Sequence, residues 1–123
     1  MDAATRAVRL NGMRLLFICS QNLLRSPTAE RIFSARPGFE VASAGMAPDA
    51  VKLVSAEAIE WADMIFVMEE WHRELLQRRF RRHLEQKHLI CLGIPDRYEY
   101  MDPQLVELLE LKVTPYLSKG VKV

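Results

Sequence analysis

Short, mostly apolar runs alternate with segments of helical spacing, and this alternation is the feature that most constrains the fold. The runs cover residues 15–18, 39–42, 64–68 and 88–92. The segments predicted as helices cover residues 26–35, 55–61, 69–87 and 103–116. Apolar runs of this length are typical of buried parallel strands, and a β-α-β alternation favours helices on both faces of a parallel sheet. We therefore predict a three-layer α/β fold with a four-stranded parallel sheet.

The charge of the chain is close to balanced. Its 123 residues include 17 basic and 16 acidic residues, which give a formal net charge of +1. This balance gives no overall attraction to nucleic acid or to an acidic membrane surface, so we expect neither as a partner. Residues 78, 79, 81 and 82 are all arginine, but on a helix they spread over its exposed arc. We interpret this run as a solvated helix face.

The cysteine count and the N-terminal segment bear on location. Cys19 and Cys91 are the only cysteines, which is too few for a secreted disulfide scaffold of this size. No apolar run reaches transmembrane length, and the N-terminal segment lacks the apolar core of a signal peptide. We expect a cytoplasmic protein, with residues 1–12 as a disordered extension and residues 13–123 as a single α/β domain.

The segment between the first apolar run and the first predicted helix carries the candidate chemistry. Cys19 ends the strand, Arg25 follows after five residues, and Ser26 and Pro27 are typical of a helix N-cap and first turn. Five intervening residues can curl their backbone N–H groups around an anion, and a helix N-terminus adds partial positive charge. The same field favours a thiolate over a thiol. We call residues 19–26 the phosphate loop; its predicted phosphate-binding members are Ser20, Gln21, Asn22, Leu23, Leu24, Arg25 and Ser26.

In this segment the chain resembles the low-molecular-weight protein tyrosine phosphatases, and within them a compact bacterial branch. Beyond the phosphate loop, the resemblance extends to Ser43-Ala44-Gly45, Ala62-Asp63 and Ile94-Pro95-Asp96. It implies phosphomonoester hydrolysis through a cysteinyl-phosphate intermediate, without a cofactor or metal. It also implies a phosphorylated protein or a small aryl phosphate as substrate, with inorganic phosphate and vanadate as inhibitors. Gln21 stands where the family usually has glycine, and we expect its side chain to narrow the loop or to add an amide beside the phosphate.

The resemblance assigns a role to each matching residue. Cys19 would be the nucleophile, and Arg25 would hold the equatorial phosphate oxygens. Asn22 would maintain the unusual backbone of the loop, since asparagine tolerates positive φ. Ser26 would donate a hydrogen bond to the Cys19 sulfur, and Ser43 would brace Asn22.

The general acid has two candidates. Asp96 follows Ile-Pro as in the family, although Arg97 stands where a second proline is usual. Asp102 keeps an Asp-Pro pair, but its place before Pro103 is explained by an N-cap of the last helix. We favour Asp96 and keep Asp102 as the alternative; Tyr98 and Tyr100 on the same loop are candidates for a wall against an aryl ring.

Two other functions remain open at this point. A module that binds phosphate or phosphopeptide without turnover would need the loop but not the acid. An arsenate reductase would need further cysteines to relay a disulfide, and Cys91 is the one cysteine left, in an apolar run that predicts a core position. The three histidines have no ligand spacing with the cysteines, so we expect no metal site.

Overall fold

The computed structural model describes residues 12–121, and its strands form one parallel sheet. The strands are β1 (Met13–Cys19), β2 (Phe39–Gly45), β3 (Met64–Val67) and β4 (His88–Cys91). The helices are α2 (Arg25–Ser34), α3 (Ala56–Trp61), α4 (Glu70–Phe80), the short 3₁₀ helix η1 (Arg82–Leu84) and α5 (Pro103–Val121). The strand order is β2-β1-β3-β4, and every pair is parallel, so the predicted four-stranded α/β fold is confirmed.

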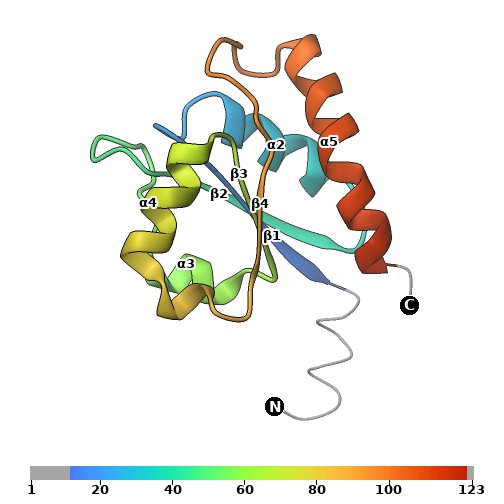
Figure 1. Ribbon diagram of the computed structural model, residues 1–123. Coiled ribbons are helices and arrows are strands. Elements are labelled where there is room, and N and C mark those ends of the chain that lie inside the picture. Colours follow the sequence, from blue (N-terminus) through green and yellow to red (C-terminus); the bar gives the residue numbers. More distant parts are fainter. Residues whose placement is uncertain (1–11, 122–123) are drawn as a thin grey trace.

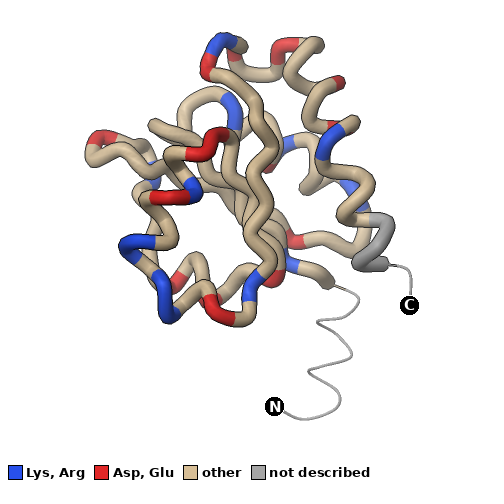
Figure 2. Tube along the Cα trace, in the orientation of Figure 1, with Lys and Arg blue, Asp and Glu red and all other residues tan. Residues whose placement is uncertain are grey.

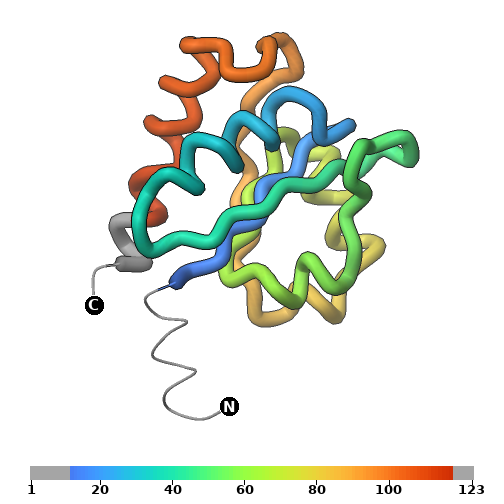
Figure 3. Tube along the Cα trace, turned by 180° about the vertical axis from the view of Figure 1, so that it is seen from behind, coloured from blue at the N-terminus to red at the C-terminus, as the bar shows by residue number. Residues whose placement is uncertain are grey.

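The helices cover the two faces of the sheet in pairs. Figure 1 shows α2 and α5 on one side of the strands and α3 and α4 on the other. The view from behind shows the same separation, with β2 as the edge strand nearest the viewer (Figure 3). Each face has its own core, because Phe33 and Leu109 pack in one cluster and Ile59 and Leu76 in the other.

Strand β1 is covered by helices on both faces, and this explains why its sequence is apolar without alternation. Leu15 and Phe17 face the α2 and α5 side, whereas Leu16 and Ile18 face the α3 and α4 side. All four side chains are fully buried. Successive side chains of a strand point to opposite faces, so a strand covered on both sides needs apolar residues at every position.

The position of β1 also fixes where the site lies. The chain leaves β1 towards β2 on one side and later returns to β3 on the other. Ligands of such sheets bind at the carboxyl ends of the strands, where the strand order reverses. Cys19 is the last residue of β1 and therefore lies at this point.

Two predicted boundaries were wrong. Strand β2 continues beyond the predicted end at residue 42, because Ser43-Ala44-Gly45 extends the ladder with β1 as far as the pair Cys19 and Gly45. Helix α4 ends at Phe80 and not near residue 87, since the arginines crowd like charges on its last turn and the chain must reverse into β4. The predicted extension lies, except for Gly12, outside the described residues.

Among the residues that the structure describes, none of the helices has the length and apolar character needed to cross a membrane.

Candidate active site

Cys19 lies at the end of β1 with its thiol buried beneath the phosphate loop. Its side chain is 3% exposed, and its Sγ lies 2.9 Å from the Oγ of Ser26. The other acceptor within reach of the Ser26 hydroxyl, the carbonyl oxygen of Ala44, is farther away at 3.3 Å. The contact between Ser26 and Cys19 that the resemblance implies is therefore present.

Helix α2 begins at the phosphate loop without a side-chain cap. It starts at Arg25, its N-cap position is Leu24, and no side chain accepts from its first N–H groups. The prediction of Ser26 as the N-cap was wrong, because Ser26 is already inside the helix and its hydroxyl is turned towards Cys19. By contrast, Ser55 caps α3 and a reciprocal capping box starts α4. The N-terminus of α2 thus keeps its donors free for an anion.

The backbone of the loop supplies further donors. Within the described part of the chain, no backbone N–H of residues 20–25 has a protein acceptor. Successive backbone N–H groups on a turned loop form a concavity that suits an anion, and two of the residues with an unpaired N–H, Asn22 and Arg25, are buried. Asn22 has φ 57°, the left-handed conformation expected for it, and this turns the chain into the loop.

Arg25 is held beside the loop by three partners. Its side chain is 1% exposed. Its Nη1 donates to Oε2 of Glu69 at 2.6 Å and to the carbonyl oxygen of Ile94 at 2.7 Å, and its Nη2 donates to Oγ of Ser20 at 3.1 Å. A guanidinium has five N–H groups. These bonds leave the Nε–H and one Nη2–H without a hydrogen-bond acceptor, and the nearest charge to Nε is Oδ1 of Asp96 at 3.7 Å. Two such N–H groups can form a fork that suits two oxygens of a phosphate.

A chain of hydrogen bonds orients the Ser26 hydroxyl. Ser43 donates to a carboxylate oxygen of Glu30, so its own oxygen accepts from Nδ2 of Asn22 at 2.9 Å. The same Nδ2 also donates to Oγ of Ser26 at 2.9 Å. Because Ser26 accepts there, its proton is available to the sulfur of Cys19. The brace between Ser43 and Asn22 was predicted, whereas Glu30 as its far end was not.

The segment after β2 supports the phosphate loop from outside. Three of its backbone N–H groups, those of Met46, Ala47 and Val51, donate to the carbonyl oxygens of residues 19, 20 and 21. Gly45 lies at this junction without space for a side chain. A Cβ there would be 2.7 Å from the carbonyl oxygen of Ser20 and 3.0 Å from the backbone nitrogen of Asn22.

Replacing Gly45 by alanine is expected to displace the loop. Overpacking of this kind typically costs about 1–3 kcal/mol of unfolding free energy. A shift of the loop by about 1 Å would lower kcat/KM for an aryl phosphate by roughly 10²-fold. Gly38→Ala is the matched control, because Gly38 has φ 91° in the turn before β2, so the variant is strained but spares the loop. A Gly45→Ala enzyme with wild-type kcat/KM would contradict this expectation.

The two candidate acids lie in different surroundings. Oδ1 of Asp96 is 3.7 Å from Nε of Arg25, and the side chain is 57% exposed. Asp96 also lines a small cavity of about 40 Å³ together with Cys19, Gln21, Leu23, Leu24 and Arg25. Oδ1 of Asp102 instead accepts from the backbone N–H of Gln104 at 2.8 Å, which is the predicted N-cap of α5. The structure thus brings Asp96, and not Asp102, to Cys19.

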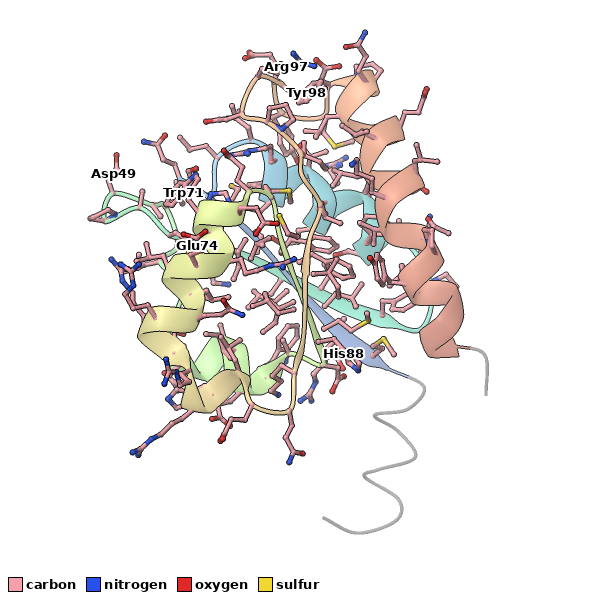
Figure 4. All side chains as sticks on the ribbon, viewed as in Figure 1. Asp49, Trp71, Glu74, His88, Arg97 and Tyr98 are labelled. Atoms are coloured by element: carbon pink, nitrogen blue, oxygen red, sulfur yellow. The ribbon has the colours of Figure 1, made fainter. Side chains whose placement is uncertain are left out.

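The other predicted site residues divide between the rim and the surroundings. The side-chain amide of Gln21 donates to Oδ2 of Asp49 at 3.1 Å, while the residue also lines the small cavity. Figure 4 shows Asp49, Trp71, Arg97 and Tyr98 at the same end of the molecule as the loop, and His88 at the opposite end. Tyr98 packs against the core with Arg97 over its ring, whereas Tyr100 is 46% exposed.

His72 is a buried residue of the site that the sequence did not reveal. Its ring is fully buried near the start of α4. Its Nδ1 accepts from the backbone N–H of Glu69 at 3.0 Å, and its Nε2 lies 3.0 Å from Oγ of Ser20. Burial, and then the positive charge of Arg25, lower the pKa of His72 to about 4, against the opposing effects of Glu69 and Asp96. The imidazole is therefore neutral at physiological pH.

This lowered pKa makes stability depend on pH. The unfolded chain protonates His72 near the ordinary value of 6.5, but the folded protein does so only near 4. The neutral His72 therefore contributes its full share to the free energy of unfolding above pH 6.5. This contribution is lost as the pH falls towards 4, at no more than about 1.4 kcal/mol per pH unit. Denaturant titrations between pH 7 and 4 should show a shallower loss for His72→Gln, which cannot titrate. Parallel curves for the two proteins would contradict the assignment.

Other features lie apart from this site. A hollow of about 570 Å³ runs along α4 between Glu74 and Glu85, and it contains no nucleophile. Figure 2 shows basic residues over the end of α4; the four arginines there are exposed, as expected of a solvated face. Among the described residues, no group of histidine, cysteine and acidic side chains has the arrangement of a metal site.

Comparison with known proteins supplies structural relatives only. No protein-family model matches the chain, and no curated protein matches its sequence. A low-molecular-weight protein tyrosine phosphatase from Streptococcus pyogenes has 16% identity and a TM-score of 0.71, over 87% of this chain and 92% of its own. The YwlE arginine phosphatase from Geobacillus stearothermophilus has 20% identity and a TM-score of 0.69, over 89% and 96%. Wzb from Vibrio vulnificus, in complex with benzylphosphonate, has 22% identity and a TM-score of 0.65, over 90% and 99%. The chain therefore has the fold of the low-molecular-weight protein tyrosine phosphatases.

Proposed function

We propose that the protein hydrolyses phosphomonoesters, with a phosphotyrosine-like aryl phosphate as substrate, through a covalent phosphate on Cys19. The observation that carries this proposal is the buried thiol of Cys19 beneath unpaired backbone N–H groups and an uncapped helix. The free edge of Arg25 completes the set of donors around an anion. Leu23, which is half exposed, and Leu24 add an apolar lining that suits an aryl ring.

The reaction takes two steps. The Cys19 thiolate attacks phosphorus, the bond from phosphorus to the ester oxygen breaks, and Asp96 gives that oxygen its proton. Water then attacks the phosphocysteine while the Asp96 carboxylate accepts a proton from it. The bond from phosphorus to sulfur breaks, and phosphate leaves. The hydroxyl of Ser26 stabilises the sulfur anion each time it forms, from 2.9 Å.

The position of Cys91 argues against an arsenate reductase. Cys19 packs in the core cluster beneath α2 and α5, whereas Cys91 packs against the cluster beneath α3 and α4. Side chains on opposite faces of a sheet cannot join in a disulfide without disruption of the strands. Cys19 and Cys91 of one chain are therefore not placed to form the disulfide that such a reductase needs.

Turnover of an aryl phosphate tests the proposal directly. We expect release of phosphate from p-nitrophenyl phosphate, inhibition by vanadate, and a phosphorylated Cys19 peptide after rapid quenching in acid. A protein that binds vanadate but releases no phosphate between pH 5 and 8 would be a binding module, and the proposal would fall.

The role of Asp96 predicts an effect that depends on the leaving group. Asp96→Asn should lower kcat for phenyl phosphate, a poor leaving group, by about 10²-fold, and for p-nitrophenyl phosphate by much less. Asp102→Asn is the matched control, because asparagine also caps helices well and should leave both rates near wild type. Equal rates of Asp96→Asn and wild type on phenyl phosphate would remove Asp96 from the mechanism.

A further inference from the structure

The side chain of Ser20, the residue after the nucleophile, joins two parts of the site that are far apart in sequence. Its Oγ lies 3.1 Å from Nη2 of Arg25 and 3.0 Å from Nε2 of His72. His72 is fully buried, so this contact is shielded from water. The Ser20 hydroxyl thus lies between the buried ring and the guanidinium that faces the anion.

The direction of each hydrogen bond follows from the donors. Nδ1 of His72 accepts from the backbone N–H of Glu69, so the proton of the neutral ring is on Nε2. That Nε2–H donates to Ser20, and Nη2 of Arg25 also donates to Ser20 because a guanidinium has no lone pair to offer. The Ser20 oxygen therefore accepts two hydrogen bonds, which fix its position between the two donors.

This arrangement gives the guanidinium contacts on both of its terminal nitrogens. Glu69 and the carbonyl of Ile94 hold Nη1, and Ser20 holds Nη2. With contacts to Nη1 alone, the guanidinium plane of Arg25 could rotate about Nη1. A fixed second end determines the plane, and with it the direction of the Nε–H, which has no hydrogen-bond acceptor and lies 3.7 Å from Oδ1 of Asp96.

We propose that His72 is a positioning residue for the phosphatase reaction, which acts through the Ser20 hydroxyl to hold Arg25 in the orientation that binds the transition state. This inference rests on the proposed function and adds the two residues that prepare Arg25 for it. Glu69 contributes at both ends of the arrangement, since its backbone N–H orients the ring and its carboxylate holds Nη1.

A pair of His72 variants separates this role from the capping of α4. His72→Asn places an oxygen near the position of Nδ1, so it keeps the bond from the Glu69 N–H but lacks the donor to Ser20. His72→Gln places an amide N–H near the position of Nε2 and keeps that donor. We expect His72→Asn and Ser20→Ala each to lower kcat/KM for p-nitrophenyl phosphate and the affinity for vanadate about tenfold, the effect of one hydrogen bond to a charged group. His72→Gln should recover most of that loss, with thermal unfolding of all three variants measured alongside.

Double variants test whether the effect passes through Arg25. Ser20→Ala should have no further effect in an Arg25→Lys background, and the variant with both Ser20→Ala and His72→Asn should match Ser20→Ala alone. Additive losses, or a His72→Asn protein that loses stability but keeps wild-type kcat/KM and vanadate affinity, would overturn the inference. If the wild type binds vanadate without turnover, the proposed function fails, and the same couplings measured on vanadate affinity still decide the role of His72.

Discussion

Replacement of Cys19 by serine is expected to reduce aryl phosphate turnover by at least about 10⁴-fold, the scale seen when a covalent nucleophile is removed. In the proposed mechanism the sulfur of Cys19 attacks phosphorus, whereas a serine hydroxyl is a much weaker nucleophile and has no general base beside it. Its neighbour Ser26 is directed by Asn22 to donate and cannot serve as that base. Steady-state rates with p-nitrophenyl phosphate measure the loss.

The same variant should retain its anion site. The backbone N–H groups of residues 20–25 and the guanidinium of Arg25 are unchanged, and serine is close to cysteine in size. Calorimetry should therefore show phosphate bound about as tightly as by wild type. Cys91→Ser, on the opposite core cluster, is the control and should keep its activity. Turnover by Cys19→Ser within tenfold of wild type would exclude the covalent mechanism.

The parts of the molecule that could be predicted from sequence are those set by local patterns. The run from Leu15 to Ile18 indicates a strand covered on both faces, and the structure buries all four residues. Ser55 and Asp102 indicate helix starts, and both accept the backbone hydrogen bonds of a cap. Cys19 and Arg25 have a spacing that joins strand, loop and helix, so their side chains meet at one end of the sheet.

The contacts that could not be predicted depend on strand order. Glu69 and His72 belong to a segment that indicates only the start of a helix, and their spacing fits a capping box, which is present. They reach Ser20 and Arg25 because β3 lies directly beside β1, and the alternation of strands and helices does not determine that neighbour. The role of Gly45 could not be predicted for a similar reason, since its close approach to Ser20 involves two backbones and no side-chain pattern. The prediction of Ser26 as an N-cap was wrong for a different reason. A serine at this position suits either an N-cap or a hydroxyl that donates to the sulfur of Cys19, and the sequence pattern is the same for both.

Arg25→Lys is the second variant with a large expected effect. Lysine keeps the positive charge beside Glu69, so the fold should tolerate it. A single ammonium cannot hold Glu69, the carbonyl of Ile94 and Ser20 and still present two parallel N–H groups to a phosphate. The transition state spreads charge over the equatorial oxygens that this fork binds. We therefore expect kcat/KM to fall about 10³-fold, near the upper range for removal of one preorganised oxyanion donor.

An exposed arginine of the same site separates geometry from charge. Arg97 is next to Asp96 and lies over the ring of Tyr98 at 5.7 Å, so Arg97→Lys makes the same chemical change without touching the fork. It should change kcat/KM by less than about threefold, as is usual for exposed charges in salt solution. Vanadate affinity should follow the same order, because vanadate needs the equatorial donors as the transition state does. Equal effects of the two variants would mean that Arg25 acts through net charge alone, and the fork would then have no special part in the reaction.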